Sequence, residues 1–197
     1  SEGILECFKH VLKEFGYQPK DDRTIYNTIG MTLVDAFDLL TDMPDNPQRE
    51  DMRKAYVKKA DEVMVKKTYF YDDTIALLQT LQNAGVKVGI VSTKYRYRIV
   101  NTFNEQAGSL PVDIIVGGED VTKAKPDPQG LDLIVERFGA DKSDVLYIGD
   151  SYIDAETALN SGVDFAGVTT GSTTKEDFEK YPHIYIGSSL LDIFQNI

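Results

Sequence analysis

The chain has few of the residues that mark extracellular, membrane or histidine-dependent metal proteins. Its one cysteine, Cys7, excludes an internal disulfide framework. The two histidines, His10 and His183, have no partner at ligand spacing, which disfavours a histidine metal site. No stretch is apolar for long enough to form a membrane span or the core of a signal peptide. We therefore expect a cytoplasmic protein without a membrane partner.

Positive charge is also scarce. The chain carries 21 lysines and arginines against 32 acidic residues, which gives a formal net charge of -11 and a pI of about 4.6. Such a surface repels nucleic-acid phosphates and anionic lipid headgroups. A hydrophobic fraction of 42% over 197 residues is nevertheless enough for a well-buried core. We expect a small-molecule partner and no nucleic acid, and the sequence leaves the oligomeric state open.

The first part of the chain has helical periodicity and no strand pattern. Apolar residues recur at helical spacing over residues 4–16, and Gly16 stands where a left-handed helix end would lie. Further helices are expected around residues 33–40 and 50–65, separated by a segment with two prolines. We expect residues 1–70 to form a small all-helical domain.

From residue 71 onward, strand and helix patterns alternate. Strands are expected at residues 86–91, 114–116, 145–148 and 165–168. Helices are expected at residues 74–84, 95–103, 128–138, 153–160 and 189–194. This alternation is typical of an α/β fold with a parallel sheet. We expect residues 71–197 to form a Rossmann-like core.

Polar side chains follow three of the expected strands. Ser92 and Thr93 follow the first, Lys125 lies in the loop after the second, and Asp150 and Asp154 follow the third. Because the carboxyl ends of parallel strands lie at one edge of a sheet, these groups can converge. Ser92 could donate to an oxyanion and Lys125 would add positive charge. The two carboxylates repel unless a cation such as Mg²⁺ lies between them, so the pattern predicts a phosphate-and-metal site.

Each of these residues also has a simpler structural interpretation. Ser92 could be a helix N-cap, and Lys125 could be a solvated turn residue. Asp154 could favour a helix start through the macrodipole, and Asp150 could end a strand in a turn. Three matches in one order on one edge favour the joint site over separate caps.

Two further segments have weaker patterns. Lys94, Arg96 and Arg98 could steer an anionic substrate, or they could be exposed helix surface. Residues 171–174 lack the glycine spacing and the lysine of a P-loop, so a flexible loop is expected there and not a phosphate cradle.

These motifs resemble the haloacid dehalogenase-like hydrolase superfamily, in particular its phosphoglycolate-phosphatase-like branch. Residues 90–94, 125–128 and 149–154 resemble its second, third and fourth motifs. The resemblance implies that Ser92 and Lys125 are catalytic and bind the phosphoryl group, with Thr93 beside them in the substrate site. It assigns Asp150 and Asp154 to a Mg²⁺ site, with Asp150 the closer ligand. It further implies hydrolysis of a small phosphomonoester, with phosphoglycolate as the first candidate substrate. Residues 1–70 would form the helical cap that closes over the site and selects the substrate.

One motif of the family has no counterpart in the chain. These enzymes carry an Asp-x-Asp motif at the end of the central strand, where the first Asp becomes a phosphoaspartate and the second acts as acid and base. Residues 1–5 resemble the stretch just after that motif, so we expect the central strand upstream of Ser1. Without it, the neighbouring strands would keep unpaired backbone groups.

The missing motif leaves other functions open. A non-catalytic protein that binds Mg²⁺ and phosphate for regulation is one alternative. A related pyrophosphatase or a sugar-phosphate mutase is another, because the cap selects the substrate. A doubly wound domain whose strand-end residues are only caps is the third.

Overall fold

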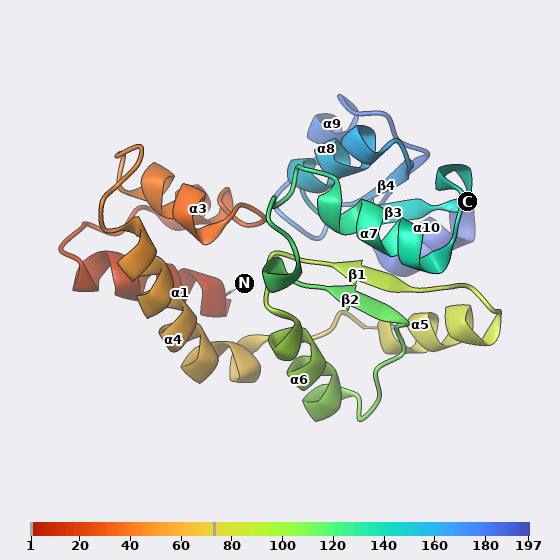
Figure 1. Cartoon of the computed structure of the whole chain (residues 1–197), viewed down its shortest axis with the longest axis horizontal. Helices are drawn as coiled ribbons and strands as arrows, with labels where there is room; N and C mark the ends of the chain where they lie inside the picture. Colours follow the sequence, from red (N-terminus) through yellow and green to blue (C-terminus); the bar gives the residue numbers. More distant parts are fainter. Residues whose placement is uncertain (1, 73) are drawn as a thin grey trace. The chain divides into compact units, whose positions relative to one another are not determined.

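The chain changes architecture between Tyr69 and Phe70, where it divides into two compact units. The computed structural model describes residues 2–72 and 74–197, and the side chains of residues 64–67 are left aside (Figure 1). Among these residues, no helix is both long and apolar enough to cross a membrane. Each unit has its own hydrophobic core.

The helical unit contains α1 (Glu2–Glu14), α2 (Asp22–Tyr26), α3 (Leu33–Leu40) and α4 (Arg49–Lys67). The three expected helices are confirmed, and Gly16 has the left-handed φ of +84° that its place after α1 predicts. Helix α2 was not expected, because its five residues are too few to show a helical period. Its start is stabilised by Asp21, whose carboxylate accepts a hydrogen bond from the Thr24 amide.

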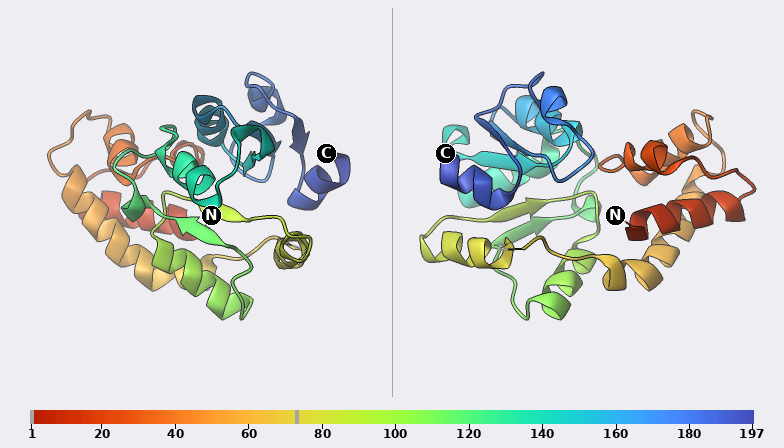
Figure 2. Two further views of the ribbon diagram at one scale, coloured as in Figure 1. Left: turned by 45° about the vertical axis from the view of Figure 1, so that its right-hand side comes forward. Right: turned by 180° about the vertical axis from the view of Figure 1, so that it is seen from behind.

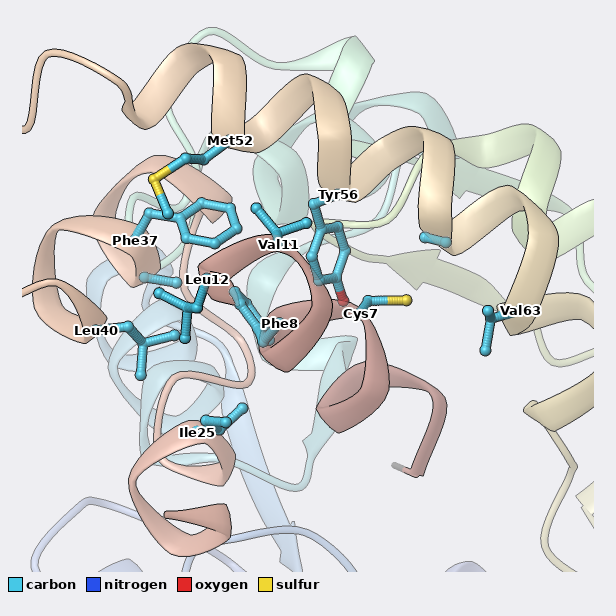
Figure 3. Close-up of a cluster of buried hydrophobic side chains, with 12 residues drawn as sticks. Cys7, Phe8, Val11, Leu12, Ile25, Phe37, Leu40, Met52, Tyr56 and Val63 are labelled. Atoms are coloured by element: carbon cyan, nitrogen blue, oxygen red, sulfur yellow. The ribbon is translucent and has the colours of Figure 1, made fainter. Parts of the chain in front are cut away.

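Aromatic rings lie at the centre of the core of the helical unit (Figure 3). The ring centroids of Phe8 and Tyr56 are 4.7 Å apart, and those of Phe8 and Phe37 are 5.3 Å apart. Cys7 and Val11 of α1 are fully buried beside them. A buried apolar side chain of this size contributes about 1.5–3 kcal/mol, so this cluster is the main stabilising element of the unit.

The second unit is an α/β fold in which all strands run parallel. Strand β1 (Gly89–Val91) pairs with β2 (Ile114–Val116), and β3 (Leu146–Gly149), β4 (Asp164–Val168) and β5 (Tyr185–Gly187) pair in that order. The four expected strands are present, although β1 is shorter than residues 86–91. It begins late because the Val88 amide donates to the side chain of Asp113 and not to a strand neighbour. The sequence analysis missed the three-residue β5.

The parallel strands of this unit form two separate sheets. Figures 1 and 2 show β1 and β3 on the facing sides of the two sheets. Within the part of the chain that the structure describes, β1 pairs only with β2, and β3 pairs only with β4. The expected sheet is therefore divided at its middle, between β1 and β3.

Helices surround both sheets at the expected places. They are α5 (Thr74–Asn83), α6 (Arg96–Gln106), α7 (Gln129–Phe138), α8 (Tyr152–Ser161), α9 (Lys175–Phe178) and α10 (Leu190–Asn196). Gly139 and Gly162 end α7 and α8 with φ angles of 60° and 80°, as their positions predict. The four-residue α9 was not expected. Apolar residues of α7 and α8 pack on Phe165 of β4, which fixes the strand ends where the polar residues lie.

Candidate active site

Hydrogen bonds hold the loop that carries Lys125. The Gln129 side-chain oxygen accepts from the amides of Thr122 and Lys123 at 2.9 and 2.8 Å. The Asn160 side chain in α8 donates to the Pro126 carbonyl at 2.9 Å. The Lys125 side chain is 12% exposed. The structure therefore fixes this lysine in place, unlike a solvated turn residue.

Asp154 is the partner of Lys125, and its carboxylate receives four hydrogen bonds. Its Oδ1 accepts from Lys125 Nζ at 2.6 Å and from the Tyr147 hydroxyl at 2.9 Å. Its Oδ2 accepts from the Ser151 hydroxyl at 2.6 Å and the Ser151 amide at 3.1 Å. A carboxylate has about four lone-pair sites, so these donors fill it. Asp154 is thus an anchor for Lys125, and its expected role as a metal ligand stays a prediction.

The surroundings of Asp154 keep it ionised although it is buried. Burial by itself raises the pKa of Asp154, but the Lys125 charge and the hydrogen bonds from Lys125, Ser151 and Tyr147 outweigh it and lower that pKa below its usual range. Burial, followed by the charge of Asp154, raises the pKa of Tyr147 well above its usual value. Tyr147 therefore remains a hydroxyl donor to a charged carboxylate.

Asp150 has the opposite environment, although it lies only four residues away. Among the described residues no side chain donates a hydrogen bond to its carboxylate, and the backbone amide of Asp150 itself is the one hydrogen-bonding group that lowers its pKa. Burial and then the charge of Asp154 raise the pKa of Asp150, while the charges of Lys125 and Lys94 oppose the increase. A carboxylate whose lone pairs are not occupied by side-chain hydrogen bonds can bind a hard cation. Asp150 is therefore the residue of this edge that fits Mg²⁺.

A complete metal cage is not present in the described residues, where no three acidic, histidine or cysteine side chains come together. Mg²⁺ does not require one, because it is usually bound through one or two carboxylates with waters and substrate phosphates. The donor set at Asp150 is compatible with that mode of binding.

Residues 171–174 pack against the strand end that carries Asp150. A Cβ atom at Gly171 would lie 2.3 Å from the Asp150 carbonyl oxygen, so only glycine fits here. The buried Thr173 hydroxyl accepts from the Tyr152 amide at the start of α8. These contacts hold the segment over the end of β3, which its sequence pattern did not indicate.

Ser92 and Thr93 lie at the carboxyl end of β1, and Ser92 is not the cap of the following helix. The N-cap of α6 is Tyr95. The Ser92 hydroxyl oxygen accepts from the Lys94 amide at 3.1 Å, which leaves its own proton for another acceptor. The geometry is that of a hydroxyl prepared to donate.

The start of α6 already has a negative partner. The Arg96 amide donates to both carboxylate oxygens of Glu119, at 2.8 and 3.1 Å. Gly118 packs against the same turn. Its amide donates to the Lys94 carbonyl, and a Cβ atom at Gly118 would lie 2.6 Å from the Thr93 carbonyl oxygen. Glu119 therefore occupies the first amide of α6.

Some of the predicted site residues contact each other directly, whereas others share only the edge of the sheets at which their strands end. Lys125 and Asp154 form an ion pair, and Asp150 lies within their electrostatic field. Ser92 and Thr93 share the carboxyl edge but belong to the other sheet. Tyr147 was not expected in the site, because in the sequence it resembles the apolar residues beside it in the strand. Its position two residues before Gly149, on the same strand face, is the only available signal.

Curated proteins with similar sequences cover most of the chain. The Pyrophosphatase PpaX of Oceanobacillus iheyensis is 25% identical over 190 residues, which are 96% of this chain and 86% of that protein. The phosphoglycolate phosphatase of Shigella boydii serotype 4 is 28% identical over 148 residues, 75% of this chain and 57% of that one.

Solved structures show the same fold. A structure from Bacteroides fragilis assigned as a haloacid dehalogenase-like hydrolase is 46% identical, with a TM-score of 0.92, and covers 96% of this chain and 90% of that one. A predicted phosphoglycolate phosphatase from Haemophilus somnus 129PT has a TM-score of 0.86 at 16% identity, over 98% and 90% of the chains, which shows the fold alone. The family model of the haloacid dehalogenase-like hydrolases matches residues 1–168. With this match over most of its length, the chain belongs to the haloacid dehalogenase-like hydrolase family.

Proposed function

We propose that the protein is a Mg²⁺-dependent phosphatase that hydrolyses a small phosphomonoester. The observation that carries the proposal is the buried Lys125–Asp154 pair next to the open carboxylate of Asp150. Phosphoryl transfer needs positive charge held at the phosphoryl oxygens and a site for a hard cation. In this proposal Lys125 supplies the positive charge and Asp150 the cation site.

Each residue has a defined task in this proposal. Lys125, fixed by Asp154, contacts a phosphoryl oxygen, and the Ser92 hydroxyl donates to another, with Thr93 adjacent in the substrate site. Asp150 holds Mg²⁺, and Asp154, whose oxygens already accept four hydrogen bonds, adds negative charge beside the metal site. When bound, the cation shields phosphate charge so that an anionic nucleophile can approach.

The nucleophile is proposed to come from a strand that pairs with both β1 and β3. The edges of these two strands face each other without a partner among the described residues, which supports the idea. An aspartate at its end would attack phosphorus in line, and the bond to the leaving oxygen would break. A second acid would protonate that oxygen, and water would then hydrolyse the acyl phosphate. The intact mass of the native protein, compared with 22.0 kDa, tests whether such a segment exists.

The choice of substrate is proposed to lie with the helical unit acting as a cap. Phosphoglycolate is the first candidate, because the resemblance and one curated relative point to it. Pyrophosphate is the second, because other relatives carry the name pyrophosphatase. A mutase would instead accumulate an isomerised sugar phosphate without free phosphate.

The test is a phosphate-release assay on the native protein with phosphoglycolate, pyrophosphate and p-nitrophenyl phosphate, with Mg²⁺ or with EDTA. We expect Mg²⁺-dependent release that Lys125→Met and Asp150→Asn each reduce by at least about a hundredfold. Lys142→Met is the matched control, since Lys142 also pairs with an aspartate, Asp132, but away from the strand ends. Its activity should equal that of the wild type.

A protein that binds Mg²⁺ and phosphate without turnover is the competing function. It would release no phosphate from any of the three substrates, and Asp150→Asn would have no turnover to lose. Calorimetry would still detect Mg²⁺ binding that this substitution abolishes. That pair of results would replace the phosphatase proposal with a regulatory binding role.

A further inference from the structure

Tyr147 and Asp154 meet on one face of β3 because Gly149 leaves room for them. Side chains two residues apart in a strand share a face, so positions 147 and 149 point the same way. A Cβ atom at Gly149 would lie 2.2 Å from the Cβ of Asp154. The Asp154 side chain therefore lies directly over Gly149, and this position brings its carboxylate to the Tyr147 hydroxyl at 2.9 Å.

The two oxygens of Asp154 have different kinds of partner. Oδ2 is held by Ser151, the N-cap of its own helix, in a capping box. Oδ1 contacts the ammonium of Lys125, which stands at the end of a flexible four-carbon stem. Ser151 and Lys125 alone would leave the direction of Oδ1 dependent on that stem. Tyr147 is the third contact, and the rigid β3 strand supplies it.

Tyr147 is itself held firmly. Its ring packs in the cluster of Leu131, Val135 and Phe165, with the Phe165 ring centroid 6.5 Å away. An ionised carboxylate is only an acceptor, so the phenol must be the donor in their hydrogen bond. A partly buried donor on a packed ring gives the carboxylate, and through it the lysine, a defined direction.

Other tyrosine–carboxylate contacts in the same unit lack this connection. The Tyr181 hydroxyl donates to Glu156 at 3.1 Å, and its ring packs on the same apolar cluster as Tyr147. No hydrogen bond or ion pair in the described structure joins Glu156 to a lysine. Tyr181 is therefore a matched comparison, with similar packing but no link to Lys125.

We propose that Tyr147 is a positioning residue of the phosphoryl site, whose hydroxyl orients Asp154 and thereby sets where the Lys125 ammonium meets a phosphate group. The inference rests on the proposed function for the use of Lys125. It concerns binding as well as turnover, because an ammonium set in the right place is needed for both.

The test is a double-mutant cycle on inorganic phosphate binding, measured by calorimetry with the native protein in the presence of Mg²⁺. Tyr147→Phe removes only the hydroxyl, and we expect it to weaken phosphate binding about tenfold. If Tyr147 acts through the lysine, the same change in a Lys125→Met background should have almost no further effect. Tyr181→Phe should leave phosphate binding unchanged in either background.

The outcomes separate the inference from the proposed function. Equal effects of Tyr147→Phe in both backgrounds would show a general packing role and overturn the inference. Equal effects of the Tyr147 and Tyr181 substitutions would do the same, as would a wild-type protein that does not bind phosphate. Phosphate binding with the expected cycle, but no turnover of any substrate, would overturn the phosphatase proposal and leave the role of Tyr147 intact.

Discussion

In the helical unit a neutral amide, Asn46, closes the polar network between α3 and α4, whereas the α/β unit buries a charged pair, Lys125 and Asp154. The Asn46 side chain is 1% exposed and bonds to the Tyr17 and Thr41 hydroxyls, both at 3.0 Å. Its side-chain oxygen accepts from the Gln48 amide, so the side-chain amide is satisfied by neutral partners, while the Asn46 backbone amide donates to Asp38.

This difference follows from the cost of removing each group from water. A satisfied amide network is inexpensive to bury, and here it holds a loop. A buried ion pair loses the hydration of two charges, and apolar residues in its place are often as stable or more so. Its presence at a strand end is therefore better explained by a need for charge at that point than by stability.

The largest expected effect on stability is that of Asp154→Ala. The substitution leaves Lys125 without its carboxylate and removes the acceptor of Tyr147 and Ser151. We expect a loss of about 3–5 kcal/mol in the free energy of unfolding of the α/β unit, measured by urea unfolding and hydrogen exchange. Asp132→Ala is the control, since that more exposed aspartate also pairs with a lysine. An equal loss for both would remove the distinction between the buried pair and an ordinary one.

The next effect is that of Asn46→Ala in the helical unit. Three hydrogen bonds of a buried amide are lost, and we expect the unit to lose about 2 kcal/mol. Hydrogen exchange should speed up in α3 and α4 and stay unchanged in the α/β unit. The exposed Asn27→Ala is the control, with no change expected. Faster exchange across both units would contradict the separate cores.

Asp150→Asn should have a smaller effect, and in the stabilising direction. The raised pKa of Asp150 means that its charge opposes folding at neutral pH, so the amide should raise the thermal midpoint there. The gain should disappear as the pH falls through the raised pKa of Asp150 towards the unfolded value of about 3.9. The contribution of Asp154 to the pH dependence of stability has the opposite sign. Its lowered pKa adds stability above the unfolded value, and this stability is lost on acidification.

Mg²⁺ titrations sharpen the same prediction. Mg²⁺ should raise the thermal midpoint of the wild type, because a ligand of the folded state stabilises it, and should not change that of Asp150→Asn. A variant that is less stable than the wild type at neutral pH would show that the Asp150 charge is stabilising and contradict the assigned sign.

The smallest effect is expected for Lys54→Ala on the surface of the helical unit. Lys54 and Asp51 pair at 3.0 Å, but both side chains are 67% exposed. Water and salt screen such a pair, so its loss should not change the urea midpoint beyond the error of the measurement. A clear decrease in the urea midpoint would show that exposed ion pairs of α4 also contribute to stability, and that burial does not separate the Lys125–Asp154 pair from them.

Helices of eight residues or more could be predicted from the sequence, because their apolar period repeats over several turns. Residues 33–40 coincide with α3, and the glycines after α7 and α8 have the expected left-handed φ. The short helices α2 and α9 could not, because five and four residues carry too little helical pattern; β5 was also missed, although β2, of the same length, was predicted. The late start of β1 depends on Asp113, which lies 25 residues away from Val88.

The sequence by itself determined the family, the alternation of strands and helices, and the order in which Ser92, Lys125 and Asp150 follow their strands. These depend on local patterns and on the rule that parallel strands end at one edge. Only the tertiary structure decided that Asp154 is filled by four donors while Asp150 keeps open oxygens, that Tyr147 joins the site, and that Glu119 takes an amide of α6. Ser151 and Tyr147 are near Asp154 in the chain, but Lys125 is 29 residues away from it and Glu119 is 23 residues away from Arg96, so these contacts come together only once the chain has folded.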